Sequence, residues 1–403
     1  MSDEAWLHCL TCSARFPIGR MFYGCPVCAV KGKTGPLEVR YAFRAENPRF
    51  SSGRRSGLWS WCSLLPPVRE NSRVSLGEGQ TPLMPVACGT TGLRLLLKNE
   101  TANPTWSWKD RPNCVSVSMA REFGFRHSAA ISSGNHGCAS AAYSTAANMS
   151  CVVFCDPSAP PSQLALMASY GARIVRGGHR ESLFLQLLER GDHYPCSIFC
   201  PRPGYANPFG IEGFKTIAFE IYEQLDHQIP DRVFVPVGSG DGIYGVWKGF
   251  RELRELGFVA DAPKMIACQA SGADSAFRAF HRRARHIEPL TSISTAALSI
   301  AERVTGDHAL RAVYQSGGSV LTCSDEAALA AMKLLLRQGF ALEMASAVVL
   351  ACLQQATSEG SRGETWVMIG SGSAVKWGTM AGNFEMPRLW DSDVASLSEI
   401  CFD

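Results

Sequence analysis

The sequence has few charged residues, a small net charge and no long apolar run. Charged residues make up 19% of its 403 residues, and the formal net charge is +3. So small an excess of positive charge predicts no extended surface for nucleic acid or anionic lipid. The longest stretch without a charged residue, 127–155, is interspersed with Ser, Gly, Asn and His, unlike a membrane-spanning helix. We therefore expect neither a nucleic-acid partner nor a membrane segment.

The start of the chain also lacks the features of a secretory signal. Met1 and Ser2 are followed by Asp3 and Glu4, where a signal peptide carries Lys or Arg before an apolar core. We therefore expect a cytoplasmic protein. In that reducing compartment, the 16 cysteines predict free thiols or metal ligands rather than a disulfide framework.

Composition and patterning predict an α/β fold. A content of 46% apolar and 9% aromatic residues excludes disordered and fibrous classes. From about residue 76 onward, short apolar runs alternate with amphipathic stretches, which predicts parallel sheets flanked by helices. The expected strands are 93–98, 128–132, 151–155, 173–176, 232–237, 264–269 and 365–369. The expected helices are 112–123, 137–147, 162–170, 214–225, 243–256, 325–337 and 346–355.

Two CxxC turns mark the first part of the chain. Cys9 and Cys12 form one turn, and Cys25 and Cys28 form the other. Such turns present sulfurs to one tetrahedral ion, as in a zinc ribbon, and a short segment with little core gains folding energy from the metal. We expect a small zinc-ribbon-like segment at residues 1–46 and a linker or wrapping segment at 47–75. Buried thiols, or a ribbon that has lost its metal, are the alternatives.

Lys109 is the candidate nucleophile. It lies between Trp108 and Asp110, among aromatic and small polar residues, in the segment NPTWSWKDR at positions 103–111. A lysine that is desolvated by such neighbours has a lowered pKa, and its amine can then form an imine.

This segment is similar to the cofactor-lysine motif of the fold type II pyridoxal-phosphate enzymes, in the threonine synthase branch. Other segments resemble that family in the same order: LGEGQTPL at 76–83, SSGNHG at 132–137, NPFGIEGFKT at 207–216 and VPVGSG at 235–240. The ribbon resembles those of some archaeal and bacterial members. The resemblance covers nearly the whole chain and implies a two-lobed catalytic domain at 76–400, with a smaller lobe at roughly 112–200 inserted in the larger one.

The resemblance also implies residue roles. Lys109 would hold pyridoxal phosphate and act as base and acid. The implied cofactor-binding residues are Asn135, at the 3-hydroxyl, Gly238, Ser239, Gly240, Asp241 and Gly242, at the phosphate, and Ser371, beside the ring nitrogen. The implied substrate-binding residues are Thr105, Ser107, Ser133, Gly134 and His136. Ser373 is the second choice for the ring nitrogen, and Glu343 stands where the family has a glutamate near the cofactor.

Two features leave alternatives open. The segment 240–245 also fits GxGxxG, a dinucleotide-binding pattern, although the next expected strand ends in Gln269 rather than in an acidic residue. Asp241 would repel a phosphate unless its side chain is paired or points away. A further departure from the family is Trp106, at a position that is usually Gly. Its bulk is expected to narrow the pocket or to stack on a different substrate; the alternative is that it points into the core and only packs.

The resemblance therefore implies a lyase that converts O-phospho-L-homoserine and water to L-threonine and phosphate. A β-elimination or β-replacement enzyme acting on serine, threonine or O-phosphoserine is the alternative within the same class, motivated by His136 and Trp106. A non-catalytic interaction protein that has kept the fold is the alternative from another class. Pyridoxal phosphate, zinc in the ribbon, a small amino-acid substrate and a homodimer are the expected cofactors and partners.

Overall fold

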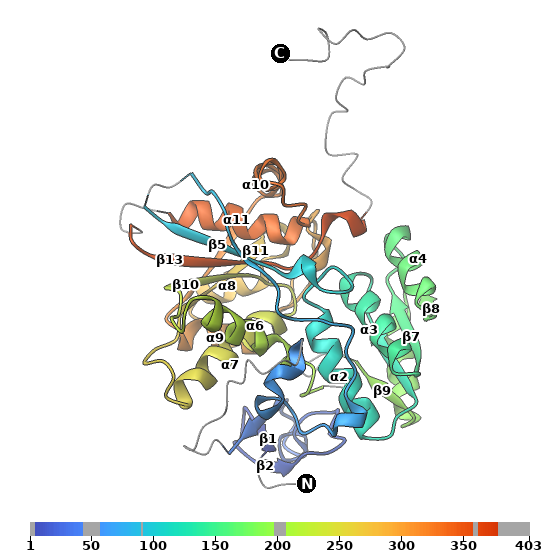
Figure 1. Ribbon diagram of the computed structural model, residues 1–403. Helices are drawn as coiled ribbons and strands as arrows, with labels where there is room; N and C mark the ends of the chain where they lie inside the picture. Colours follow the sequence, from blue (N-terminus) through green and yellow to red (C-terminus); the bar gives the residue numbers. More distant parts are fainter. Residues whose placement is uncertain (1–4, 43–56, 90–91, 197–206, 358–361, 378–403) are drawn as a thin grey trace, which may run out of the picture.

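The computed structural model describes residues 5–42, 57–89, 92–196, 207–357 and 362–377 (Figure 1). Within these ranges the strands form three separate sheets. None of the helices in these ranges combines the length and the apolar character that crossing a bilayer requires.

The largest sheet has six strands and is almost entirely parallel. Its order is β12 (Ser319–Cys323), β11 (Lys264–Ala270), β10 (Arg232–Pro236), β13 (Thr365–Gly370), β5 (Arg94–Asn99) and β4 (Leu83–Pro85). Only the edge strand β4 runs antiparallel to its neighbour. Helices α10 (Asp325–Arg337) and α11 (Met344–Ala356) lie on one side of it, and α6 (Ile211–Gln224), α7 (Asp241–Glu255) and α9 (Asp307–Gln315) lie on the other (Figure 1). A parallel sheet covered on both faces explains its continuous apolar strands.

The second sheet has four parallel strands. Its order is β8 (Arg173–Arg176), β7 (Ser150–Cys155), β6 (His127–Ile131) and β9 (His193–Pro195). Helices α3 (Asn135–Ala146) and α4 (Pro161–Ser169) pack on one face around Met167, and α5 (Arg180–Glu189) packs on the other around Phe184. Helix α2 (Asp110–Glu122) lies between this sheet and α6, and α8 (Ser275–His281) lies beside the large sheet.

The third sheet belongs to the cysteine-containing segment, called the ribbon below (residues 5–41). Its order is β2 (Arg15–Pro17), β1 (Ala5–Cys9) and β3 (Leu37–Tyr41), all antiparallel, with a short helix α1 (Pro26–Ala29). Figure 1 shows this sheet at the end of the molecule opposite α10.

The expected α/β class and all the expected strands and helices are confirmed. The difference lies in where five helices start: α2, α3, α6, α7 and α11 each begin two or three residues earlier than the pattern predicts. The reason is that the polar loops run directly into these helices, so that Asn135 and Asp241 are themselves helical residues. The pattern did not predict α5, α8, α9 or the strands β4, β9 and β12. We retain the division at residues 46, 75 and 400, and the lobe at 112–200, as a proposal.

Candidate active site

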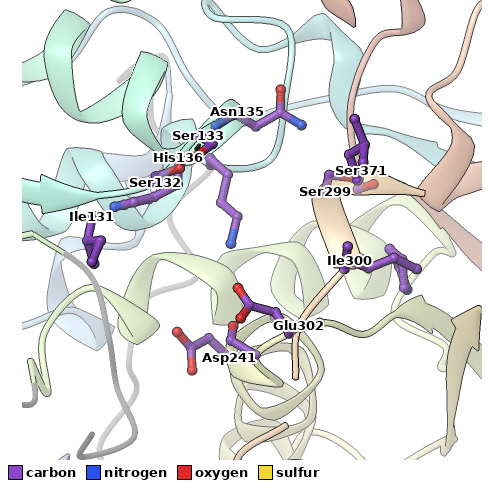
Figure 2. A pocket seen from close by; sticks show the side chains of 18 of the residues that line it. Ile131, Ser132, Ser133, Asn135, His136, Asp241, Ser299, Ile300, Glu302 and Ser371 are labelled. Atoms are coloured by element: carbon purple, nitrogen blue, oxygen red, sulfur yellow. Dashed lines mark hydrogen bonds between the residues drawn. The ribbon is translucent and has the colours of Figure 1, made fainter. Parts of the chain in front are cut away.

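One cavity of about 960 Å³ lies at the carboxyl ends of β6, β10 and β13. Its walls include the segments after these strands and after β7, the starts of α5 and α6, Lys109 and the loop 298–304. Figure 2 shows Ser133, Asn135 and His136 on one side, Ser371 on another, and Asp241 and Glu302 opposite them. This is the place where parallel α/β sheets bind their ligands.

Lys109 reaches into this cavity from the residue before α2. Its Nζ lies 5.7 Å from the ring centre of Trp108 and 5.4 Å from that of Phe214. Burial lowers the pKa of Lys109, and the carboxylates of Asp241 and Glu302 only partly oppose this. A lysine with a lowered pKa is more often neutral, as a nucleophile or base must be.

The loop 132–137 leads from β6 into α3. The Asn135 side chain donates from Nδ2 to Glu343 Oε2 at 2.8 Å, while its Oδ1 is buried without a partner among the described residues. His136 contacts Asn113 Nδ2 and Ser140 Oγ, both at 3.1 Å. Burial lowers the pKa of His136 to about 3, so its imidazole is neutral at physiological pH.

The glycine loop 238–242 leads from β10 into α7. Gly240 has φ +97°, a conformation that favours glycine, and a Cβ on Gly242 would lie 2.2 Å from the Trp108 ring. The loop therefore combines close packing with the start of a helix, where backbone N–H groups attract an anion. Asp241 is paired, as a phosphate site requires: its Oδ1 lies 3.0 Å from Nε2 of the buried His308.

Ser371 and Glu343 close the third side. Ser371 Oγ donates to Glu343 Oε1 at 2.8 Å, and Trp377 Nε1 donates to Glu343 Oε2 at 2.7 Å. Glu343 is buried, so it is neither solvated nor a side-chain cap of α11. Ser371 lines the cavity, whereas Ser373 does not.

Comparison with known proteins decides the family. Residues 74–372 match the family described as "Pyridoxal-phosphate dependent enzyme". The chain belongs to this family. It is 36% identical to a threonine synthase of Methanocaldococcus jannaschii over 91% of this chain and 92% of the relative, and 33% identical to one of Methanosarcina acetivorans over 98% of each. It is thus a threonine synthase-like lyase of fold type II whose cofactor is pyridoxal phosphate.

Solved structures of the same fold type are more distant in sequence. The match to a maize serine racemase spans 75% of this chain and 91% of the racemase chain, at 22% identity and with a TM-score of 0.64. A threonine deaminase of Solanum lycopersicum covers 81% and 92% at 21% identity, with a TM-score of 0.65. At these identities the likeness establishes the fold.

The cavity of this pyridoxal-phosphate enzyme fits its cofactor. The Lys109 side chain makes no ion pair or hydrogen bond with the described residues, and the free Asn135 Oδ1 can accept a hydrogen bond. The loop 238–242 offers a place for an anion, and Ser371 supplies a hydroxyl at the opposite wall. We propose that these residues hold the cofactor.

The structure does not bring every candidate residue to the cavity. Ser133, Gly134 and His136 line it, but Thr105 and Ser107 are buried in the turn before Lys109 and do not. Thr105 N donates to Asp110 Oδ2 at 3.0 Å. Their role toward the substrate stays a prediction.

Trp106 does not narrow the pocket. Its side chain is 46% exposed and is not part of the cavity wall. Its φ of +59° lies in the left-handed region, which explains why relatives are expected to have glycine there. The expectations that Trp106 contacts the substrate or packs in the core are therefore wrong, because its side chain is exposed and lies outside the cavity wall.

A buried ionic cluster behind Lys109 was not predicted. Arg111 Nε lies 2.6 Å from Glu100, and its Nη1 lies 2.6 Å from Glu220, which also pairs with Lys98 at 2.7 Å. All four side chains are buried, and Thr81 of the LGEGQTPL segment donates to Glu100 at 2.6 Å. The cluster therefore ties the first turn of α2, next to Lys109, to β5 and α6.

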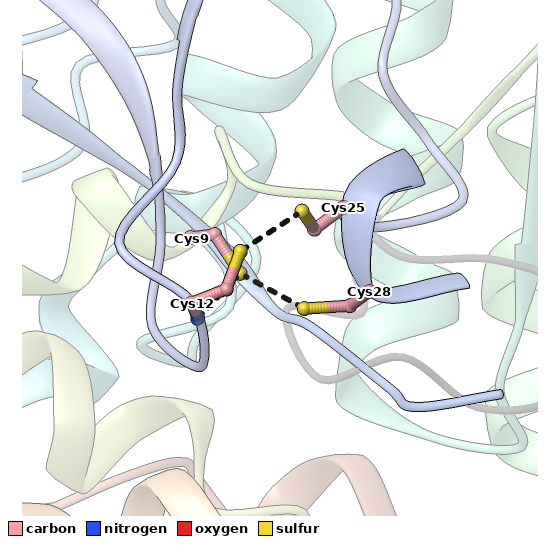
Figure 3. Close-up of side chains that lie close together, drawn as sticks. All are labelled: Cys9, Cys12, Cys25 and Cys28. Atoms are coloured by element: carbon pink, nitrogen blue, oxygen red, sulfur yellow. Dashed lines mark hydrogen bonds between the residues drawn. The ribbon is translucent and has the colours of Figure 1, made fainter. Parts of the chain in front are cut away.

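The four cysteines of the CxxC turns converge (Figure 3). Their sulfurs all lie within 4.8 Å of one another, with Cys9 and Cys28 at 3.7 Å and Cys12 and Cys25 at 3.6 Å. Zn–S bonds of about 2.3 Å in a tetrahedron require sulfurs about 3.8 Å apart. We propose that these thiolates bind zinc.

We expect metal analysis to find about one zinc ion per chain. Cys12→Ser should lower zinc affinity by roughly tenfold or more and lower the unfolding temperature, because ligand binding stabilises the folded ribbon. Cys62→Ser, outside the cluster, is the control and should keep its zinc. A chain without bound zinc whose melting temperature does not respond to added zinc would contradict the assignment.

Proposed function

We propose that the enzyme converts O-phospho-L-homoserine and water to L-threonine and phosphate. The observation that carries this proposal is a desolvated lysine between two helix-start loops, in a chain that is 36% identical to a threonine synthase. In this reaction a proton is removed from Cβ, the Cγ–O bond breaks and phosphate leaves. The hydroxyl of water then bonds to Cβ, and Cγ gains a proton to become the methyl group.

The residues of the cavity have distinct proposed roles. Pyridoxal phosphate, when bound, stabilises the negative charge that forms at the substrate Cα. Lys109 Nζ removes the Cα proton and returns protons during the later steps, for which its lowered pKa suits it. The backbone of loop 132–137, at the start of α3, binds the substrate carboxylate. His136 stays neutral and holds this loop against Asn113.

Arg180 is the proposed ligand of the substrate phosphate. The cationic side chains that line the cavity in the described ranges are Lys109, Arg180 and Arg303. Arg303 donates hydrogen bonds from both Nε and Nη2 to the carbonyl oxygen of Leu290. Arg180, 33% exposed, is held by Nη1 on Asp156 at 2.7 Å, and its other N–H groups make no further bond to the described residues. A guanidinium fixed in this way suits a phosphate.

Assays with O-phospho-L-homoserine, O-phospho-L-serine and L-serine test the proposal. We expect threonine and phosphate from the first substrate. Arg180→Ala should raise its KM by roughly tenfold or more, because a charge-assisted hydrogen bond is lost. Arg190→Ala is the matched control, because Arg190 follows the same helix, lies outside the cavity wall and should leave KM unchanged.

Product identity separates the alternatives. Pyruvate or a replacement product from serine or O-phosphoserine, without threonine from O-phosphohomoserine, would move the enzyme to the β-elimination or β-replacement class. An unchanged KM in Arg180→Ala with normal threonine formation would reject only the role of Arg180.

A further inference from the structure

The ribbon is joined to the catalytic body by a buried polar contact. Glu38 of β3 is completely buried, and its Oε2 accepts a hydrogen bond from Tyr244 Oη at 2.7 Å and lies 3.2 Å from Arg251 Nη2. Lys248 Nζ donates to the carbonyl of Val39 at 2.7 Å. Residues 244, 248 and 251 are spaced to lie on one face of α7, so all these contacts from β3 reach the same side of this helix.

A second contact joins the same strand to α6. Tyr41 Oη donates to Glu212 Oε2 at 2.7 Å, and Lys215 Nζ lies 4.1 Å from the centre of the Tyr41 ring. Lys215 and Lys248 both pair with Glu212 and Glu252. The ribbon therefore contacts α6 and α7, two of the three helices that cover this face of the large sheet.

Helix α7, which the ribbon contacts, begins at the glycine loop 238–242 of the candidate active site. Tyr244 lies one turn into α7, and its ring contacts the ring of His308 edge-on at 5.5 Å. His308 in turn holds Asp241, and Gly242 packs against Trp108 without room for a Cβ. A shift of α7 along its axis would therefore displace the loop 238–242 or press it against Trp108, beside Lys109.

On the other side, Glu38 lies next to the cysteine cluster. In the β1–β3 ladder, Cys9 pairs with Leu37 and His8 pairs with Glu38. A Cβ on Gly35 would lie 2.9 Å from the sulfurs of Cys9 and Cys28, so the segment before β3 is packed directly on these sulfurs. The position of β3 thus depends on how well the four cysteines are held in place.

We propose that Glu38 is a positioning residue through which the ribbon, when its cysteines hold a metal, sets the glycine loop for the cofactor's phosphate. Loss of Glu38 or of the metal weakens phosphate binding at a distance. The inference rests on the proposed role of the loop 238–242, but not on which amino acid the enzyme converts.

The test measures equilibrium binding of pyridoxal phosphate and of pyridoxal, which lacks the phosphate, to the full chain freed of cofactor. We expect Glu38→Gln and Tyr244→Phe each to weaken pyridoxal phosphate binding by roughly tenfold, a usual strength of coupling between sites, and to leave pyridoxal binding unchanged. Removing the metal from the wild type should produce the same selective loss. In Glu38→Gln, metal removal should add little, because the two changes break one connection.

Glu255→Gln is the matched control. Glu255 also pairs with Arg251, at 3.4 Å, but it is 48% exposed and lies outside the ribbon, so its loss should change neither affinity. Unchanged binding of pyridoxal phosphate in Glu38→Gln and Tyr244→Phe would overturn the inference. An equal loss of both ligands would overturn it too, because it would indicate general loosening of the fold. Neither readout requires turnover, so failure of the proposed reaction would be seen separately in the substrate assays.

Discussion

Lys109→Ala is expected to abolish turnover while leaving the fold intact. The side chain makes no ion pair or hydrogen bond with the described residues, so its removal leaves no buried charge without a partner. Loss of the group proposed to move protons should lower kcat by at least about 10³-fold. The visible absorbance band of the bound cofactor should also be lost or shifted, because the covalent attachment is gone.

Borohydride reduction followed by mass spectrometry checks the attachment directly. The wild type should retain the mass of the cofactor on the peptide containing Lys109, and the variant should not. Lys264→Ala, at the exposed start of β11, is the control and should behave as the wild type. A variant that keeps both the band and the turnover would exclude Lys109 as the cofactor lysine.

Among the proposed variants, Arg111→Met is expected to lose the most unfolding free energy. It would leave Glu100 and Glu220 buried with only Lys98 to balance them. Burial alone would raise the pKa of Glu220, and Arg111 and Lys98 hold it below its usual value. Removing one partner from such a buried group costs about 3–5 kcal/mol, a large part of the usual 5–15 kcal/mol free energy of unfolding.

Urea denaturation of both forms measures this loss. Arg69→Met is the control: Arg69 also pairs with a glutamate, at 2.8 Å, but it is 69% exposed, so its loss should cost at most about 1 kcal/mol. In the wild type, the contribution of the depressed Glu220 pKa is present at neutral pH and is lost as the pH falls below the usual carboxyl range. Equal losses of unfolding free energy in the two variants would show that Glu100 and Glu220 do not depend on Arg111 to balance their buried charge.

Short-range patterns were sufficient for most of the proposed chemistry. The candidate cofactor lysine, the two loops that start α3 and α7, and the paired CxxC turns are each contained within a few consecutive residues. The alternation of apolar runs and amphipathic stretches likewise reports local geometry, because strands and helices repeat over short distances. These features could therefore be recognised from the sequence, although the helix starts were displaced where a polar loop is itself the first turn.

The remaining features depend on residues that are distant in the chain. Glu343 joins Asn135 across 208 positions, and Tyr244 joins Glu38 across 206. Trp106 is exposed and has a left-handed backbone angle, neither of which its neighbours in the sequence predict. Local sequence thus determined the class, the candidate lysine and the loops proposed to bind ligands. Only the tertiary structure decided which buried charges balance one another, because desolvation makes each buried charge depend on partners that the topology brings to it.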